Sequence, residues 1–319
     1  MIDRIRERRR AALGFASKID LDLMTEKSKT NLIEFNNPVP VRHYGRWVMT
    51  AFLVIMAVSI AASLATNPNF HWNVVGRYLF DPQILRGVGW TLGLTVVAMS
   101  VSIAIAAALV IMRDSGNPVL SKLSWFWVWF FRGTPVYTQL VFWGLLSVLY
   151  PRISISLPIV GDLFDLRTKD VFTPAAAAIA GLAFNESAYL AEIFRAGFKA
   201  VDGGQTEAAE ALGMRRMKIL LRIVIPQAMR MIIPPTGNET IGMLKTTSLV
   251  LAVPFAYDLT FAANTISNRL YLPIPLLVVA ATWYLAITSL LMWGQSHLER
   301  HFARGLDRNQ AAIMPKESA

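Results

Sequence analysis

Long apolar blocks separated by polar and basic segments dominate the chain. The blocks are roughly 18 to 26 residues long, which is the length that an α-helix needs to cross a hydrocarbon core of about 30 Å. We therefore predict an all-α integral membrane protein with about six crossings. They are expected at residues 47–65, 89–112, 125–150, 174–198, 236–253 and 273–294.

Proline and glycine interrupt this pattern at two places. In the third block, Gly133 and Pro135 should bend or restart the helix. Between the fourth and fifth crossings lies a basic segment, residues 199–233, that is not apolar enough to cross. Pro226 suits the first turn of a helical piece there, and Pro234 and Pro235 are expected to end that piece before the fifth crossing.

Three regions follow from this layout. Residues 1–45 form a basic N-terminal extension, which has no apolar core close behind its arginine run and so does not resemble a cleavable signal peptide. Residues 46–298 form a transmembrane domain that contains the loop 199–233, and residues 299–319 form a polar tail.

The positions of lysine and arginine predict the orientation. If the N-terminus is cytoplasmic, the inner segments 1–46, 113–124, 195–230 and 297–319 hold 23 of these residues, and the outer segments 66–86, 151–172 and 255–272 hold 6. Positive charge accumulates on the cytoplasmic side of membrane proteins. Both termini should therefore be cytoplasmic, and the net charge of +10 needs no nucleic-acid partner to explain it.

The composition also excludes several kinds of site. The chain has no cysteine, which rules out disulfides, thiolate metal sites and cysteine nucleophiles. His297 and His301 stand four residues apart near the last helix end, and we interpret them as a solvated helix terminus. We predict no metal site and no catalytic residue.

The most informative stretch lies within the loop 199–233. Asp202 can cap a helix whose third residue is Gln205, a variant of the capping box. Glu207 and Glu210 are expected in the first turns, where the helix dipole favours negative charge, and Gly213 is placed to end the helix in a left-handed cap.

A second amphipathic pattern follows this short helix. Its apolar face is predicted to contain Met217, Leu220, Leu221 and Val224, with basic residues mainly on the other side. A membrane protein gains little from an alanine-rich helix outside the bilayer unless a partner docks there. A solvated connector is the alternative, and from the residues alone the two interpretations are about even.

This stretch resembles the EAA loop of binding-protein-dependent ABC importer permeases. The likeness consists of Glu207-Ala208-Ala209, Gly213 and Ile223-Val224-Ile225-Pro226, with Ile225 where leucine is commoner. In that family the loop forms a coupling helix that sits in a groove of the ATPase subunit. The resemblance implies the following ATPase-coupling residues: Glu207, Ala208, Ala209, Glu210, Leu212 and Gly213.

The resemblance extends over roughly residues 85–298 and is to the histidine/glutamine type, which imports polar amino acids. Its other motifs are Gly89-Trp90-Thr91-Leu92, Phe131-Arg132-Gly133-Thr134-Pro135 with Gln139, and residues 187–197, 226–228, 234–238 and 244–249. The family typically has five core helices per subunit. The N-terminal extension and first crossing therefore look like an addition.

Several polar residues are predicted at membrane depth, where charge is costly and usually faces a cavity or the bundle interior. The candidate substrate pathway consists of Asn185, Glu186, Ser187, Asn238, Lys245 and Thr246. Glu186 and Lys245 would meet the ammonium and carboxylate of a zwitterion. The alternative is an internal ion pair or a polar contact that only stabilises helix assembly.

The resemblance implies an importer permease of the bacterial inner membrane, with no enzymatic activity of its own. No Walker A pattern occurs, so we expect no cofactor on this chain, and ATP and Mg²⁺ on a partner ATPase. Other expected partners are a second permease copy or a homologous permease, an extracytoplasmic solute-binding protein and the lipid bilayer. An ion-coupled secondary transporter is the alternative function, and a membrane-embedded enzyme is a third.

Overall fold

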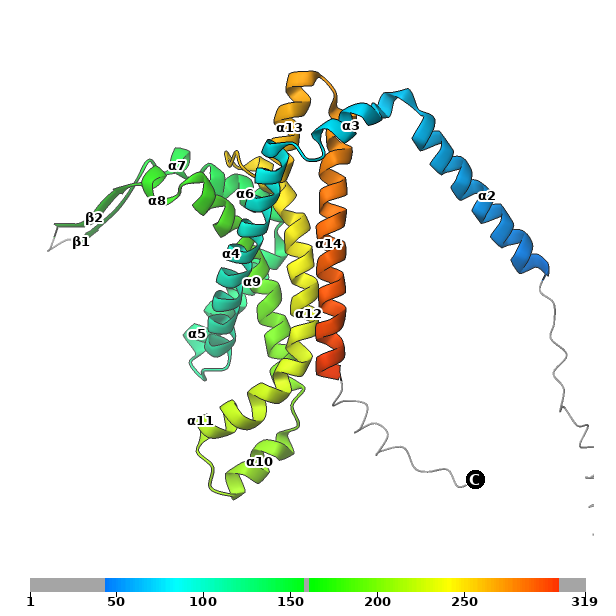
Figure 1. Ribbon diagram of the computed structural model, residues 1–319. Helices are drawn as coiled ribbons and strands as arrows, with labels where there is room; N and C mark the ends of the chain where they lie inside the picture. Colours follow the sequence, from blue (N-terminus) through cyan, green and yellow to red (C-terminus); the bar gives the residue numbers. More distant parts are fainter. Residues whose placement is uncertain (1–43, 158–160, 304–319) are drawn as a thin grey trace, which may run out of the picture. The chain divides into compact units, whose positions relative to one another are not determined.

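The computed structural model describes residues 44–157 and 161–303, and these are almost entirely helical (Figure 1). They fall into two compact units that divide between Asn67 and Pro68. The N-terminal extension, apart from its last two residues, and residues 304–319 of the polar tail lie outside the described residues.

The first unit contains one helix, α2 (Tyr44–Thr66). Its 23 residues would extend about 35 Å, enough to cross a membrane. None of them is buried within the protein, although most are apolar. The predicted first crossing, residues 47–65, is therefore confirmed as a helix of spanning length and composition.

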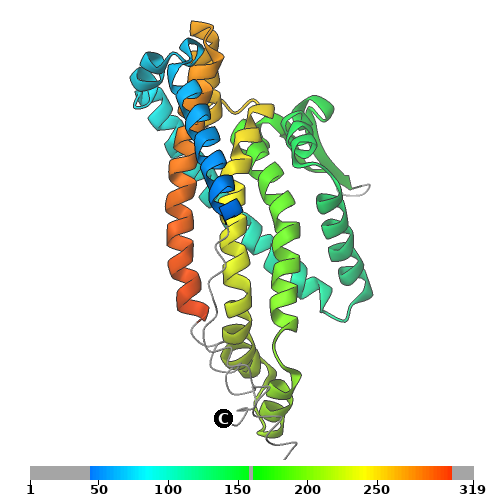
Figure 2. The same cartoon turned by 90° about the vertical axis from the view of Figure 1, so that its right-hand side faces the viewer.

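The second unit is a helical bundle with short elements at both ends (Figure 2). Its long helices are α4 (Pro82–Arg113), α5 (Pro118–Gly133), α9 (Pro174–Lys199), α12 (Ile225–Thr246) and α14 (Pro273–Ala303). Shorter helices complete the bundle: η1 (Pro68–Phe70), α3 (Trp72–Tyr78), α6 (Val136–Gly144), α7 (Leu146–Leu149), α8 (Thr168–Val171), η3 (Thr247–Ala252) and α13 (Leu259–Leu270).

The long helices begin where the sequence supplies caps. Asp81 accepts a hydrogen bond from the Gln83 backbone N–H at 2.8 Å, and Asn117 accepts one from Val119 at 2.9 Å. In each case proline is the next residue, which costs nothing at a position whose N–H has no helical partner. These caps place the starts of α4 and α5 several residues before the predicted apolar blocks.

Helix α9 lies at the centre of the bundle and packs against α4, α5, α6 and α12. Its packing face is made of small residues, which let neighbouring backbones approach closely. At Gly197 a Cβ atom would lie 2.3 Å from Ile232 Cγ1 on α12, so only glycine fits there without displacing that side chain. The alanine- and glycine-rich sequence of α9 is thus the reason for its central position.

The buried apolar side chains form two clusters. One joins α4, α6 and α9 and includes Leu140, Leu182 and Leu190. The other joins α3, the start of α4, α13 and α14, and includes Ile84, Leu259 and Leu276. Trp283 Nε1 donates to the Leu79 carbonyl at 2.8 Å and ties α14 to the chain before α4.

The bend expected in the third apolar block is present. Helix α5 ends at Gly133, Thr134 and Pro135 are extended, and α6 begins at Val136. Gln139 Nε2 donates to the Phe131 and Thr134 carbonyls at 3.0 and 3.1 Å, which holds the two helices across the bend.

The expected break at Pro234 and Pro235 is wrong. Helix α12 runs without interruption through both prolines. Neighbouring helices and side chains can satisfy the carbonyls that proline leaves free in a membrane bundle. Gln295 of α14 donates to the Pro234 carbonyl at 3.3 Å, which ties α14 to this part of α12.

A β-hairpin departs from the all-α prediction. Strands β1 (Arg152–Leu157) and β2 (Gly161–Arg167) pair antiparallel where we expected a loop. Arg152 forms an ion pair with Asp165 across the hairpin, and both are largely exposed. The fold is therefore mainly helical with one small two-stranded sheet in the described residues.

Three helices of the described residues are long and apolar enough to cross a membrane by composition alone: Tyr44–Thr66, Pro82–Arg113 and Pro273–Arg300. Helices α9 and α12 are long enough, but they carry charged residues such as Glu186, Glu239 and Lys245. Six crossings and cytoplasmic termini therefore stay predictions.

Candidate functional site

The short helix predicted in the loop is present as α10 (Gly203–Ala211), which projects with α11 (Arg216–Ile219) from one end of the bundle (Figures 1 and 2). Asp202 caps it by accepting a hydrogen bond from the Gly204 N–H at 2.9 Å. Gly213 follows the helix with φ +73°, a left-handed conformation that favours glycine. The expected start and end of this helix are therefore confirmed.

The placement of the two acidic residues differs from expectation. The helix begins where it was predicted, but its first turn contains no acidic residue, because Glu207 and Glu210 are its fifth and eighth residues. Both side chains are exposed, so their charges face outward. They lie beyond the first turn, where the helix dipole would stabilise a negative charge.

The coupling candidates present mainly exposed surface. Ala209 is buried, whereas Glu207, Ala208 and Glu210 are exposed, and Leu212 is 83% exposed. A single exposed leucine is common on protein surfaces, so Leu212 alone does not identify an interface. Helix α10 therefore packs against the rest of the protein on the side of Ala209 and exposes its other side to solvent.

The amphipathic pattern after Gly213 forms differently from the prediction. Helix α11 passes into a π-helical segment, η2 (Leu220–Val224), which leads directly into α12. A π turn has one more residue than an α turn, so it rotates the face that follows. Ile219, which precedes this segment, is buried, whereas Met217 and Leu221 of the predicted apolar face are 64% and 59% exposed.

Asn185 and Ser187 both bind neighbouring helices. Asn185 Nδ2 donates to the Phe131 carbonyl at the end of α5 at 2.8 Å. Ser187 accepts a hydrogen bond from Trp127 Nε1 at 3.0 Å and donates to the Phe184 carbonyl at 2.7 Å. These contacts fix α9 against α5 and leave these two side chains little capacity for a ligand.

Glu186 lies between Asn185 and Ser187 in the sequence, but its side chain is directed toward α12. Its carboxyl group interacts with that of Glu239 on α12. Glu186 is 8% exposed, and its Oε1 has no hydrogen-bond partner in the described part of the chain. Two carboxylates at such close range repel each other unless a proton or a cation lies between them.

Glu239 is a residue that our sequence analysis missed. It lies within the predicted fifth crossing, so the rule that identified Lys245 as a charge at membrane depth applies to it equally. The structure shows what the sequence does not, that it meets Glu186 on another helix.

The structure places Lys245 away from this carboxyl pair. Lys245 is exposed, and the three ion pairs among the described residues do not include it. Thr246 donates to its own helix at Gly242, at 3.0 Å. Lys245 and Glu186 are therefore not the internal ion pair that we considered as an alternative.

Asn238 is also exposed and contacts Gln295, a second residue that we did not predict. Gln295 Nε2 donates to Asn238 Oδ1 at 2.9 Å and to Glu299 Oε1 at 2.7 Å. A Cβ atom on Gly237 would lie 3.1 Å from Gln295 Cδ, so this amide sits directly on the α12 backbone.

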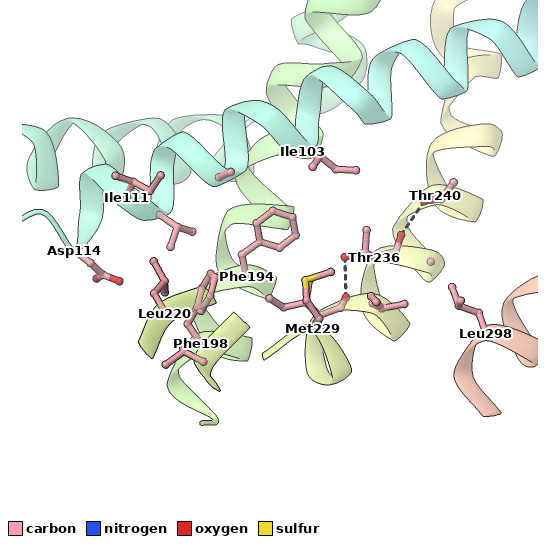
Figure 3. Close-up of a pocket in the computed structure, with 16 residues that line it drawn as sticks. Ile103, Ile111, Asp114, Phe194, Phe198, Leu220, Met229, Thr236, Thr240 and Leu298 are labelled. Atoms are coloured by element: carbon pink, nitrogen blue, oxygen red, sulfur yellow. Dashed lines mark hydrogen bonds between the residues drawn. The ribbon is translucent and has the colours of Figure 1, made fainter. Parts of the chain in front are cut away.

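A cavity of about 730 Å³ lies among α4, α9, η2 and α12 (Figure 3). Phe194, Phe198 and Met229 point into it. The hydroxyls of Thr236 and Thr240 donate to their own helix at 2.8 and 2.9 Å, and Asp114 is the one charged residue in the lining. Such a lining would leave both charges of a zwitterion poorly satisfied, so this cavity does not resemble an amino-acid site.

Comparison with known families gives a direct result. Residues 110–304 match the family described as "Binding-protein-dependent transport system inner membrane component". The chain belongs to this family. It is therefore a permease of ABC importers, a class of non-enzymatic transport subunits, and a multi-pass protein of the inner membrane.

Relatives with assigned names are amino-acid permeases. The arginine transport system permease protein ArgU of Corynebacterium glutamicum is 46% identical over 273 residues, which covers 86% of this chain and 85% of ArgU. The nopaline transport system permease protein NocM of Agrobacterium fabrum is 33% identical and covers 65% of this chain and 82% of its own length.

A solved structure agrees with these relatives. The crystal structure of an amino acid ABC transporter with histidines is 32% identical, with a TM-score of 0.57, over 70% of this chain and 95% of that chain. The methionine transporter MetNI is 15% identical with a TM-score of 0.54, over 69% of this chain and 96% of that chain, which shows a shared fold. Membership of this importer family implies an ATPase and a binding protein as partners.

Proposed function

We propose that this permease moves polar amino acids that carry a positive charge into the cytoplasm, driven by ATP that a separate subunit hydrolyses. ATP and Mg²⁺ bind to that subunit. The chain crosses the membrane about six times with both termini cytoplasmic, and a second copy or a homologous permease completes the pore.

The position of α10 supports the coupling role and carries the proposal. This helix projects from the bundle, is fixed at its two ends by Asp202 and Gly213, and exposes Leu212 and its acidic residues. A rigid, partly apolar element of this kind suits docking into a partner groove. Its movement would reach the membrane through α11, η2 and α12, which follow it in the chain.

The carboxyl pair supports the choice of substrate charge. Glu186 has a free acceptor inside the bundle, and Glu239 lies against it. A guanidinium or ammonium group between them would form charge-assisted hydrogen bonds to both carboxylates, in place of the proton that such a pair otherwise needs. The arginine permease ArgU is 46% identical, which agrees with a cationic substrate.

The first experiment tests the coupling surface. Tagged protein is purified from native membranes in mild detergent, and the proteins that co-purify are identified by mass spectrometry. We expect a Walker-type ATPase with the wild type, and a loss of about tenfold or more with Glu207→Arg, because charge reversal in a docked surface is costly. The matched control is Asp170→Arg, an exposed acidic residue on a different segment. Equal recovery of the ATPase with both variants would count against docking through α10.

The second experiment tests substrate charge. Uptake of radiolabelled arginine, glutamine and glutamate is measured in vesicles with the complete transporter. We expect arginine to be preferred, and Glu186→Gln to reduce arginine uptake more than any residual glutamine uptake. A wild type that prefers glutamate, or a variant with unchanged selectivity, would contradict the proposed role of the carboxyl pair. Uptake that persists without the ATPase would instead indicate an ion-coupled transporter.

A further inference from the structure

A second cavity, of about 450 Å³, opens between α4, α5 and α9. Its polar lining consists mainly of Arg113, Arg132 and Glu192, and its aromatic lining of Trp125, Trp129 and Tyr189. No residue of the candidate substrate pathway lines it. It therefore differs from the carboxyl pair in both position and charge.

The charges in this cavity do not balance. Glu192 forms an ion pair with Arg195 at 2.7 Å, so its negative charge is already matched. Arg113 and Arg132 belong to none of the three ion pairs in the described ranges. Asp114 also acts electrostatically on Arg195, so the three cations Arg113, Arg132 and Arg195 exceed the two carboxylates of Glu192 and Asp114 by one charge. The guanidinium groups of Arg113 and Arg132 thus line a cavity whose surroundings carry a net positive charge.

The aromatic groups hold one of these guanidinium groups in place. Arg132 lies over the ring of Tyr189, 5.2 Å from its centre. Trp125 and Trp129 stack on each other with ring centres 6.0 Å apart, and both are more than half exposed. Tryptophan and tyrosine at the surface of a membrane protein commonly lie at the level of the lipid headgroups.

The position of the cavity in the bundle is consistent with the level of the lipid headgroups. Arg113 is the last residue of α4, one of the helices with spanning length and composition. The contacts of α5 with α4 and α9 lie toward the end of the bundle from which α10 and α11 project (Figure 1). In the orientation proposed above, this end faces the cytoplasm, where anionic lipids bind basic pockets between helices.

We infer that this cavity binds the phosphate headgroup of an anionic phospholipid. Arginine pairs with phosphate in a bidentate manner. A phosphate group held by Arg113 and Arg132 would therefore neutralise the excess positive charge of the cavity. The stacked indole rings would lie beside the glycerol region and the upper acyl chains. The inference depends on the proposed orientation for its leaflet, and on nothing else in the proposed function.

The test measures lipid binding to the purified transporter complex by native mass spectrometry and by thermal unfolding in detergent. The probes are dioleoyl-phosphatidylglycerol, dioleoyl-phosphatidylcholine and inorganic phosphate. We expect phosphatidylglycerol to bind and to raise the melting temperature, phosphatidylcholine to do so far less, and inorganic phosphate to compete only weakly because it has no acyl chain.

Variants locate the site. Arg132→Gln should weaken phosphatidylglycerol binding about tenfold, the loss expected for one charge-assisted hydrogen-bonding group. Arg132→Lys should weaken it less, because the charge remains but the bidentate geometry is lost. The control is Arg269→Gln, in the last turn of α13 and remote from this cavity in the chain, which should bind as the wild type does.

Three results would overturn the inference. Equal binding of both lipids would show that charge is not recognised, and full competition by inorganic phosphate would show a free-anion site. Unchanged binding by Arg132→Gln and Arg113→Gln would place any bound lipid elsewhere. Because the readout is binding, a transporter that fails to import arginine but binds lipid in this way would refute the proposed substrate and leave the lipid site intact.

Discussion

Alanine serves two different purposes in α9 and α10. In α9, alanines such as Ala178, Ala183 and Ala188 are fully buried, because the helix lies among four others and small side chains permit close packing. In α10, Ala208 and Ala211 are exposed and Ala209 alone of the three is buried. The same residue type therefore stabilises the bundle in one helix and leaves a smooth open surface in the other.

This difference teaches that composition alone does not separate a packing helix from a docking helix. What separates them is what surrounds each helix in space. Two glycines express the contrast sharply: Gly197 of α9 has side chains directly against it, whereas Gly213 after α10 has nothing within 4 Å.

The largest effect is expected from Gly197→Val. Its side chain would overlap Ile232 on α12, and overpacking of this kind typically costs about 1–3 kcal/mol. We expect a lower melting temperature and a poor yield of monodisperse protein in detergent, measured by fluorescence-detection size-exclusion chromatography. Gly203→Ala, at a position with open space, is the control. Normal stability of Gly197→Val would contradict the close helix packing.

Gly213→Val should impair coupling and leave the stability of the bundle unchanged. Valine at φ +73° costs roughly 1–2 kcal/mol in local strain, but no neighbour is displaced. We expect the melting temperature of the bundle to stay within error while transport-coupled ATP hydrolysis falls. Coupled hydrolysis at the wild-type level, measured with the reconstituted complex, would show that the helix end has no coupling role.

Lys245→Met tests whether an exposed charge within α12 meets the substrate. If it does, arginine or glutamine uptake should fall about tenfold, the loss expected for one charged hydrogen-bonding group. Lys122→Met, an exposed lysine on α5, is the matched control. Wild-type uptake and selectivity by Lys245→Met would assign this lysine to helix assembly or to the contact with a second permease.

The smallest effect is expected from Gln295→Leu. This change removes the hydrogen bonds to Pro234, Asn238 and Glu299, which lie at exposed or partly buried positions where water can replace them, but it keeps much of the packing volume. We expect a modest loss of stability by thermal unfolding. Ser296→Ala, which removes a hydroxyl that bonds within its own helix, should change less. An equal effect of the two would mean that the link between α12 and α14 adds no stability.

The sequence predicted those features that depend on local rules. Spacing and capping were enough to find α10, its start at Asp202 and its end at Gly213, as well as the bend between Gly133 and Pro135. Each depends on backbone preferences of a few adjacent residues. The family resemblance then gave the segment a predicted role that its physical chemistry left open.

The features that escaped prediction depend on residues far apart in the chain. The contact between Glu186 and Glu239 joins α9 to α12, and no pattern within either helix reveals it. The hydrogen bond from Gln295 to the Pro234 carbonyl joins α14 to α12 across 61 residues of sequence, and the local rule that proline ends a helix takes no account of such packing. The hairpin was missed because its segment contains prolines and aspartates, which read as a loop when no register is known.

The continuity of α12 also has a mechanical consequence. A helix of 22 residues without a break is a stiff rod of about 33 Å, with η2 at one end and Lys245 close to the other. A break at Pro234 and Pro235 would have made a joint that absorbs displacement. Without such a joint, the two ends of α12, Ile225 and Thr246, belong to one continuous helix. The irregular part of this segment is instead the π turn at the start of the helix, which joins α11 to α12 and thereby connects the projecting loop directly to a membrane-length helix.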